Sequence, residues 1–560
     1  MAHGQGRTNT TVAIIGAGFS GTCTAIDLIK RNQCRDFVIL EKGLEVGGTW
    51  SDNTYPGCCC DVQSHLYSYS FEPNSNWSRE FPTQAEIQRH MVSVAEKWGL
   101  YRHIRFNSTV SEGRWNEERK KWDIAVNIGS GKEAEYGEQY TLKADFLISG
   151  VGQLNQPYYP EIRGLENFSG KVMHSARWDW TYPINGKRVA IIGNGATAAQ
   201  IIPEVAKQAI SLTVFQRTPN WVVPRNDTAI SVSRRTAYHY IPAIRKRYRS
   251  QLMDMREDFF QAASVPDTKE KDGIRKDCLE MMARSIPSNT ELRAKLTPVY
   301  PPGCKRVICS DDFFPALNRS NVTLQTDPIE QITRTSISTS GKRSHEHEID
   351  CLILATGFKT QQFLFPMEIY GSQGRSLSDV WKEAPSAFRG VNVESMPNFG
   401  ILYGPNTNLG HNSIVLMIEA QSRYLNALIG KVIAAKKAGL LLALSPKPAV
   451  IESYNKWLQE RLQKSTFADP RCQSWYKTAE GRILNNWCGT VVEYQQMMSK
   501  VQWQNYEIED PGNFMVSRGA FDQIGRVVEE SSFLQKSLDG VLIGSSVLFA
   551  GAFLWPRTRL

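Results

Sequence analysis

The chain lacks the residue patterns on which several protein classes depend. Its eleven cysteines include no Cys-x-x-Cys pair, so the sequence predicts neither a zinc ribbon nor a redox-active dithiol and favours reduced thiols. Residues 1–10 contain no apolar run, and no signal peptide is expected. The net charge is +9, but the basic residues are scattered. Their densest group, residues 245–249, lies in a predicted helix, so we expect a solvated helical face and no nucleic-acid partner.

The composition also excludes wholesale disorder, collagen-like repeats and a coiled coil. Hydrophobic residues make up 41% of the chain and charged residues 22%, which is typical of a globular protein. Because 560 residues exceed what one ordinary hydrophobic core can organise, two or three domains are expected.

Charge is absent from one segment near the C-terminus. Residues 540–556 contain no charged side chain, and Arg557 and Arg559 follow. Seventeen residues are the lower limit for a helix that spans a bilayer, and terminal arginines suit the membrane interface. We expect a cytoplasmic-facing protein anchored by this tail. The alternative is a tail that packs back on the protein.

A glycine-rich turn lies close to the N-terminus. Residues 12–21 have the pattern of a buried strand, a Gly-x-Gly-x-x-Gly turn and the start of a helix. Gly16 allows the tight turn, Gly18 lets the backbone approach a pyrophosphate, and Gly21 lets helix and strand pack closely. Glu41 ends the next predicted strand, 20 residues after Gly21, and can accept hydrogen bonds from a ribose diol. This region therefore predicts a dinucleotide site for a cofactor with a free diol.

A second turn of the same kind occurs within residues 188–199. It contains Gly193 and Gly195, and Ala198 replaces the third glycine. The following strand ends at Arg217 rather than at an acid. Because an acid would repel a 2′-phosphate whereas an arginine can pair with it, this loop favours NADPH. Two dinucleotide folds of opposite preference predict transfer of electrons from NADPH to a flavin, with FAD favoured for the first fold.

Two longer patterns resemble a known family. One is complete at every specified position of the segment between the two loops: Phe168, Gly170, His174, Trp178 and Asp179. The other comprises Gly47-Gly-Thr-Trp50, Tyr55-Pro-Gly57 and Asp61. Both patterns resemble those of Baeyer–Villiger monooxygenases, and the resemblance covers residues 10–500. It implies an enzyme that inserts one oxygen atom of O2 beside a ketone carbonyl through a C4a-peroxyflavin, giving an ester or lactone.

The resemblance also implies an organisation in domains. The fold class is α/β, with two Rossmann-like dinucleotide-binding domains. A discontinuous FAD-binding domain is expected to comprise residues 1–160 and 350–535, and the NADPH-binding domain residues 161–350. Residues 227–298 are rich in charge and helix formers, and they predict a helical insert in the second domain.

Site residues follow from the same resemblance. Arg306 corresponds to the catalytic arginine, whose fixed charge would hold an anion beside the flavin. Asp61 corresponds to the acid that orients it, and Lys305 to a lysine that helps bind the 2′-phosphate. His174 is tempting as a general base, but the resemblance places it on the interdomain linker and implies a conformational role, with Trp178 as an anchor.

The two cofactor sites are expected to involve a larger set of residues. Those expected at FAD are Gly16, Gly18, Phe19, Ser20, Gly21, Glu41, Lys42, Gly48, Thr49, Trp50, Asp61, Val62 and Tyr67. Those expected at NADPH are Gly193, Asn194, Gly195, Ala196, Thr197, Ala198, Arg217, Thr218 and Lys305. No metal site and no protein partner are expected.

Three other functions stay open at this point. A heteroatom oxygenase that forms N-oxides or sulfoxides could share most of these residues, although Trp178 and Arg306 count against it. A disulfide reductase would need a redox dithiol, and a redox-sensing binding protein would oxidise NADPH without using a ketone. Residues 64–71 and 485–487 resemble the branch common in fungal biosynthesis, so the substrate is expected to be a secondary-metabolite ketone.

Overall fold

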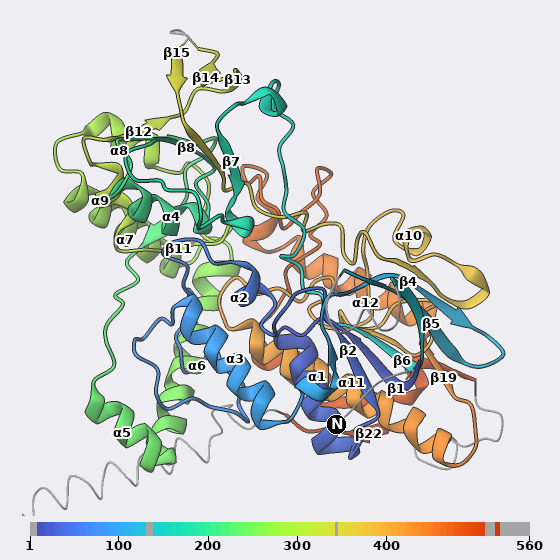
Figure 1. The fold of residues 1–560 in the computed structure, drawn as a ribbon. Helices are drawn as coiled ribbons and strands as arrows, with labels where there is room; N and C mark the ends of the chain where they lie inside the picture. Colours follow the sequence, from blue (N-terminus) through green and yellow to red (C-terminus); the bar gives the residue numbers. More distant parts are fainter. Residues whose placement is uncertain (1–7, 130–137, 342–344, 510–520, 527–560) are drawn as a thin grey trace, which may run out of the picture.

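The apolar run near the N-terminus forms β1 (Asn9–Ile15), in which six of the seven residues are buried. The computed structural model describes residues 8–129, 138–341, 345–509 and 521–526. β1 lies inside an eight-stranded sheet of order β17-β4-β5-β6-β1-β2-β3, with β18 paired to β6 (Figure 1). The other strands of this sheet are β2 (Phe37–Leu40), β3 (Ile104–Arg105), β4 (Ser108–Asn116), β5 (Lys121–Ile128), β6 (Gln139–Ser149), β17 (Glu368–Tyr370) and β18 (Phe399–Ile401).

The pairing within this sheet is mixed. β1 runs parallel to both β2 and β6, whereas β4, β5 and β6 form an antiparallel meander. β18, which lies far from β6 in the sequence, adds in parallel to β6. The first domain is therefore built from two distant parts of the chain, as the predicted discontinuous domain requires.

Two long helices pack together in this domain: α1 (Phe19–Asn32) and α11 (Ile414–Lys437). The Ser422 hydroxyl donates to Asp27 at 2.7 Å, and Asn32 donates to Asn426 at 3.0 Å. The remaining helices around this domain are α2 (Thr49–Asp52), α3 (Gln84–Lys97), α10 (Leu377–Val380), α12 (Pro448–Leu462) and α13 (Val491–Met498). Two small antiparallel pairs complete it, namely β19 (Ala443–Pro446) with β21 (Tyr506–Glu509) and β20 (Lys500–Gln502) with β22 (Phe521–Gln523).

A second sheet of five parallel strands has the order β12-β9-β8-β16-β7. Its strands are β7 (Lys171–His174), β8 (Arg188–Ile192), β9 (Ser211–Phe215), β12 (Val322–Gln325) and β16 (Cys351–Leu354). Around it lie α4 (Ala196–Ala206), α9 (Phe313–Leu317), the pair β10 (Val222–Val223) and β11 (Ile308–Cys309), and a small sheet of β13 (Ile329–Ile332), β14 (Ser336–Thr339) and β15 (His345–Glu348). The two sheets establish the predicted α/β class with two Rossmann-like domains.

One domain boundary differs from the sequence prediction. The predicted boundary at residue 350 falls before β16, yet β16 is hydrogen-bonded between β8 and β7 in the second sheet. Asp350 also accepts from the backbone and guanidinium of Arg188 on β8. The second sheet therefore extends to Leu354, because β16 is hydrogen-bonded to two of its strands. The chain returns to the first domain only after this strand.

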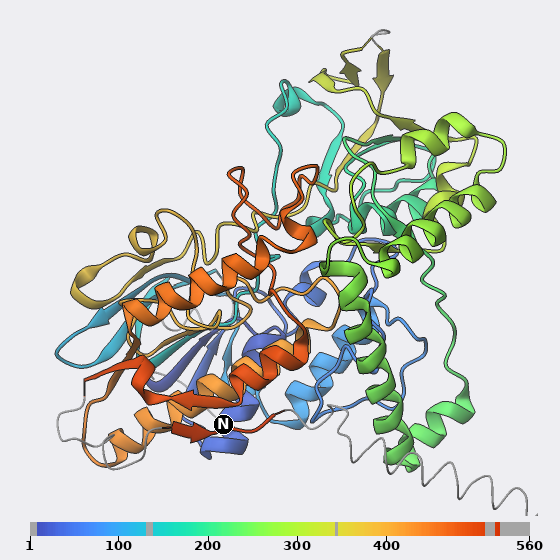
Figure 2. The ribbon, with the colours of Figure 1, turned by 180° about the vertical axis from the view of Figure 1, so that it is seen from behind.

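The predicted helical insert contains four helices. They are α5 (Val232–Tyr240), α6 (Pro242–Ser264), α7 (Lys269–Ser285) and α8 (Thr290–Leu296). Figure 2 shows α6 running down beside the first domain, with α5 at the lower tip of the molecule. The basic group at residues 245–249 is not uniformly solvated, because Arg249 is buried and donates to the carbonyl oxygens of His65 and Ser68.

Two expectations about the whole chain have different outcomes. The expectation of reduced thiols is wrong for Cys304 and Cys472, which form a disulfide with a Cα–Cα distance of 6.0 Å; the other nine cysteines are not disulfide-bonded. Residues 168 positions apart in sequence show no spacing from which such a pair can be inferred. In the described parts of the chain no helix is long and apolar enough to cross a membrane, and residues 540–556 lie outside them.

Candidate active site

The first glycine-rich turn connects β1 to α1 through backbone conformations that need glycine. Gly16 has φ +96°, and a Cβ atom there would lie 2.8 Å from the Gly150 carbonyl oxygen. A Cβ atom on Gly21 would lie 1.9 Å from the Gly16 carbonyl oxygen, so helix and strand approach as closely as predicted. α1 begins at Phe19 without a side-chain cap. Its first amides therefore point outward without intrahelical acceptors, as a phosphate-binding helix requires.

A second backbone segment faces this turn. Gly48 has φ +53°, and a Cβ atom on it would lie 3.0 Å from the Gly18 Cα atom. The short helix α2 then begins at Thr49 and places Trp50 in the core. The two glycine backbones thus approach each other closely, without side chains between them, and form a narrow cradle.

Glu41 lies at the end of β2, beside the turn. Its carboxylate accepts from the backbone amides of Ala17 and Gly43, each at 2.7 Å. Burial raises the pKa of Glu41, and these two amides oppose that rise. The neighbouring Lys42 points away and donates to the Asn155 side chain. The carboxylate is therefore fixed beside the first turn, whereas Lys42 contacts the start of the interdomain connection.

An aromatic cluster lies beside the cradle. The Trp50 indole donates to the Tyr67 hydroxyl at 3.2 Å, and Tyr67 meets the Phe19 ring edge-on at 5.4 Å. Ser20, which follows Phe19 in the sequence, and Val62 are also buried. The structure thus brings Phe19, Trp50 and Tyr67 together from three segments.

The second turn repeats the geometry between β8 and α4. Gly193 has φ +111°, and a Cβ atom there would lie 2.4 Å from the Ala355 carbonyl oxygen. A Cβ atom on Gly195 would meet no heavy atom within 4 Å, so this side of the turn is open. α4 begins at Ala196 without a side-chain cap and continues through Thr197 and the buried Ala198.

The polar side chain in this turn ties it to the end of β9. Asn194 donates to the Thr218 carbonyl oxygen at 2.9 Å and to the Gln216 side chain at 2.8 Å. These bonds hold residues 216–218 next to the turn. Arg217 lies between them and is exposed.

Two cations converge near that strand end. Burial and the positive charge of Arg217 together lower the pKa of Lys305 to about 8. Lys305 also lies over the Tyr300 ring, at 4.9 Å from its centroid. Neither Arg217 nor Lys305 forms an ion pair with another residue of the described chain. A dianionic phosphate would supply the missing counter-charge, so the residues fit NADPH.

Arg306 and Asp61 form an ion pair between the two domains. Arg306 precedes β11 in the second domain, and Asp61 ends the second family pattern in the first. Arg306 Nε and Nη2 lie 2.6 and 2.7 Å from the two carboxylate oxygens of Asp61, a two-pronged contact. The third nitrogen, Nη1, makes only a long contact of 3.5 Å to the Leu409 carbonyl oxygen. The Arg306 side chain is 32% exposed.

Both members of the pair stay charged. Burial alone would raise the pKa of Asp61, but the Arg306 guanidinium holds it below its ordinary value. The Asp61 charge in turn raises the pKa of Arg306 well above its ordinary value. The pair therefore supplies a permanent, oriented guanidinium at the domain junction.

Sequence reasoning missed a second arginine at this site. Arg256, on α6 of the helical insert, donates from Nη2 to the Asp61 carbonyl oxygen at 2.8 Å and from Nε to Gln63 at 2.9 Å. Its charge also lowers the pKa of Asp61. The only available signal was an arginine on a charged helix, which has no distinguishing pattern.

The second family pattern packs against the second domain. Gly57 has φ +78°, and a Cβ atom there would lie 2.5 Å from the Gln200 carbonyl oxygen on α4. The Gln200 amide donates to the Cys59 carbonyl oxygen at 3.0 Å. Burial raises the pKa of Cys58 to about 12 and that of Cys59 to about 11, so these thiols stay protonated. The pattern is a domain contact, and its cysteines are poor candidates for redox chemistry.

The linker pattern occupies the other side of the junction. His174 ends β7 and is buried between Tyr159, at 5.3 Å, and Phe358, at 6.0 Å, which belong to the two interdomain connections. Its Nδ1 accepts from the Ala176 amide at 3.1 Å, and burial lowers the pKa of His174. Its contacts are with the connecting segments and not with Arg306.

The remaining linker residues close this segment on itself. A Cβ atom on Gly170 would lie 2.5 Å from the Phe168 ring. Asp179 binds Lys171, which lowers the pKa of Asp179 to about 2. Trp178 packs against the core of the second domain.

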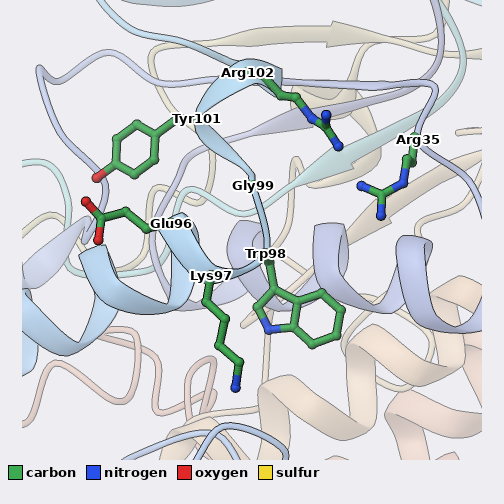
Figure 3. A pocket seen from close by; sticks show the side chains of 7 residues that line it. All are labelled: Arg35, Glu96, Lys97, Trp98, Gly99, Tyr101 and Arg102. Carbon is green, nitrogen blue, oxygen red and sulfur yellow. The ribbon is translucent and has the colours of Figure 1, made fainter.

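A shallow surface pocket of about 500 Å³ lies where α3 ends (Figure 3). Lys97 and Trp98 are engaged with Glu72 at 2.7 and 3.0 Å, and Tyr101 donates to Glu45 at 2.6 Å. No residue expected at either cofactor lines this pocket. It is therefore not part of the candidate active site. Its lining comprises Arg35, Glu96, Lys97, Trp98, Gly99, Tyr101 and Arg102.

The sequence is similar to known proteins over most of its length. The flavin-binding monooxygenase-like family matches residues 9–254. The chain is 48% identical over 551 residues to the FAD-binding monooxygenase ktnD of Aspergillus niger, covering 98% of this chain and 90% of that protein. It is 38% identical over 519 residues to a Baeyer-Villiger monooxygenase of Streptomyces coelicolor, covering 92% and 96%.

A solved structure agrees with these relatives. An oxidized steroid monooxygenase bound to NADP superimposes with a TM-score of 0.77 at 26% identity, covering 92% of this chain and 100% of that one. The predicted resemblance is thus confirmed over nearly the whole chain. The chain belongs to the Baeyer–Villiger monooxygenases of the flavin-binding monooxygenase-like family, and it is an enzyme that uses FAD and NADPH.

Proposed function

We propose that Arg306 and Asp61 form the oxygenation site of this Baeyer–Villiger monooxygenase, which inserts one oxygen atom of O2 beside a ketone carbonyl to give an ester or lactone. The observation that carries the proposal is the two-pronged ion pair between domains, with contacts of 2.6 and 2.7 Å. Each domain contributes one member of the pair, and each domain also carries one dinucleotide loop. The charged pair therefore lies on the path between the two cofactors' domains.

The residues present fit both cofactors. The Gly18 and Gly48 backbones would admit the FAD diphosphate, the N-terminus of α1 would face its charge, and Glu41 would accept from its ribose. At the second loop, Gly195 and α4 would face the NADPH diphosphate, and Arg217 and Lys305 the 2′-phosphate. Bound FAD, once reduced by NADPH, supplies the activation of O2.

Arg306 has one nitrogen available for this chemistry. Asp61 occupies Nε and Nη2, whereas Nη1 has only its 3.5 Å contact with Leu409. We assign to Nη1 the role of donating to the developing negative charge on oxygen in the ketone reaction. A donor fixed in advance needs no reorganisation during the reaction, which is the main source of electrostatic stabilisation in enzymes.

Neither member of the pair exchanges a proton during turnover in this proposal. The pKa of Asp61 is held below its ordinary value, and that of Arg306 is raised well above its own. Asp61 therefore orients the arginine and keeps it charged, and the partly buried site limits the access of water.

The substrate class follows from the family branch. We propose a ketone of fungal secondary metabolism, which residues 64–71 and 485–487 and the Aspergillus relative support. The test incubates the holoenzyme, NADPH and labelled O2 with matched ketones, amines and thioethers, and analyses the products by mass. Esters or lactones that carry one labelled oxygen support the proposal. Sulfoxides or N-oxides with no ester would instead assign a heteroatom oxygenase.

A membrane attachment is proposed from the sequence of residues 540–556 alone. Their uncharged run followed by two arginines is typical of a tail anchor. Cell fractionation with an alkaline carbonate wash tests it. The full chain should stay with the membrane pellet, and a variant with several arginines introduced within residues 540–556 should leave it. Equal release of both would contradict the anchor.

A further inference from the structure

The junction of α5 and α6 exposes a group of large apolar side chains. Tyr240 is 76% exposed, Ile241 50% and Ile244 43%. α5 ends at Tyr240, α6 begins at Pro242, and the chain turns sharply at Ile241, so the three side chains gather at one apex. Both views show this apex standing away from the body of the protein (Figures 1 and 2). Large exposed apolar groups at a protruding tip indicate a contact surface.

The two helices that carry the apex are firmly packed against the rest of the protein. Tyr238 and Tyr248 stack at 5.7 Å behind it, and both are bound to Arg234 or Glu80. Arg234 in turn pairs with Glu80 at 2.8 Å. The inner face of the two helices is therefore fixed to the first domain, and Tyr240, Ile241 and Ile244 are held outward.

The surroundings of the apex are strongly basic. Residues 228–253 contain six arginines and lysines and no aspartate or glutamate. Two of these cations are engaged internally, since Arg234 pairs with Glu80 and Arg249 is buried against His65. Of the other four cations, Arg235 donates to Asn76 and Arg245 to the Tyr238 carbonyl oxygen. These two and Arg247 are partly exposed, and Lys246 is exposed. Apolar side chains surrounded by cations complement the interface of a bilayer with anionic lipids.

The end of the described chain lies at the same end of the molecule. In both views the apex and β22 are at the bottom, and β22 precedes the described end at residue 526 by three residues (Figures 1 and 2). The sequence continues to the uncharged residues 540–556. One plane below the molecule can therefore meet the apex and pass close to β22.

We propose that the α5–α6 apex docks on a membrane surface that contains anionic lipids. This inference goes beyond the proposed reaction and concerns residues other than the tail. A second copy of the chain fits less well, because two facing apices would bring cations of the same sign together. Nucleic acid fits less well because a phosphate backbone gives no apolar partner to Ile241 and Ile244. Docking would hold the helical insert, and with it Arg256, next to a reservoir of lipophilic ketones.

The test is hydrogen exchange of the full-length holoenzyme with vesicles of phosphatidylcholine, alone or mixed with phosphatidylserine. We expect peptides covering residues 232–247 to exchange more slowly only with the mixed vesicles. The combined substitution Tyr240→Ser, Ile241→Ser and Ile244→Ser should raise the lipid concentration for half-maximal protection roughly tenfold or more. A matched variant, Ile210→Ser, Leu279→Ser and Leu441→Ser, removes three similarly exposed apolar side chains elsewhere and should keep the protection.

Attachment by the tail, by a second copy or by nucleic acid would each give a different result. Vesicle binding without protection at residues 232–247 would leave the tail as the attachment and overturn the proposal. Protection that grows with protein concentration and without vesicles would assign a second copy, and protection by duplex DNA would assign nucleic acid; either would overturn it as well. Unchanged oxidation of NADPH with a soluble ketone in the apex variant would show that the fold and the active site are intact.

Discussion

Arg256 Nη2 donates to the Asp61 carbonyl oxygen at 2.8 Å, which fixes the backbone of the acid that orients Arg306. The next residue on the same helix, Glu257, accepts from Asn412 at 2.7 Å and lies 3.4 Å from His411. Leu409, whose carbonyl oxygen faces Arg306, belongs to the same loop as His411 and Asn412. Two consecutive residues of α6 thus hold the loops on both sides of Arg306, so the helical insert supports the site mechanically.

Replacing Arg256 should loosen Asp61 without removing any charge from the ion pair itself. We expect Arg256→Leu to lower ester formation about 10- to 100-fold, because small misplacements of a catalytic group have effects of this size. NADPH should still be consumed, and more of it should yield hydrogen peroxide. Product formed per NADPH oxidised is the measurement, with Lys246→Leu on the same helix as the control. Equal coupling in Arg256→Leu and in the control would remove Arg256 from the site.

Replacing Arg306 tests the centre of the proposed site. Arg306→Ala should still accept electrons from NADPH at a rate within a few-fold of the parent, whereas ester formation should fall at least about 100-fold, the loss expected for a main electrostatic donor. Stopped-flow absorbance follows flavin reduction, and product analysis follows oxygenation. Asp61→Asn keeps the shape of the side chain but not its charge. It should also lower ester formation more than flavin reduction, but by a smaller factor than Arg306→Ala. Full ester formation in Arg306→Ala would place the oxygenation site elsewhere.

The disulfide between Cys304 and Cys472 ties the segment of Arg306 to the loop that precedes α13. It closes a loop of 168 residues, and disulfides of native proteins typically stabilise by about 2–4 kcal/mol. Cys304→Ser should therefore lower the thermal unfolding temperature by several degrees, and mild reductant should do the same to the parent. The buried, free Cys278→Ser is the control. Mass analysis of the non-reduced, alkylated protein that shows eleven modified cysteines would contradict the bond.

Local sequence patterns predicted the parts of this site that depend on local geometry. Gly16, Gly193 and Gly57 adopt positive φ, where only glycine is unstrained, so motifs that need them could be recognised. Family resemblance, and not spacing, singled out Arg306 and Asp61, which are 245 residues apart.

Contacts without a local signature were missed. Arg256 bonds Asp61 across 195 residues, and an arginine on a charged helix looks the same whether it is solvated or engaged. The same reason explains the error at residues 245–249, where Arg249 is buried and its neighbour Lys246 is exposed. The boundary at residue 350 was misplaced because β16 is a short buried strand whose sheet is chosen by its tertiary partners β7 and β8.

The pKa of Lys305 gives a test of the 2′-phosphate site that depends on pH. Burial and Arg217 lower this pKa to about 8, so the free enzyme loses the lysine charge as pH rises through that value. The 2′-phosphate is already a dianion above about pH 7, since its second pKa is about 6. The KM for NADPH should therefore be lowest near pH 7 and rise about tenfold towards pH 10, the size of one charge-assisted contact. The KM for NADH, which has no phosphate, should change little. Lys305→Arg keeps its charge at alkaline pH and should abolish the rise, whereas an identical rise in that variant would show that another group titrates.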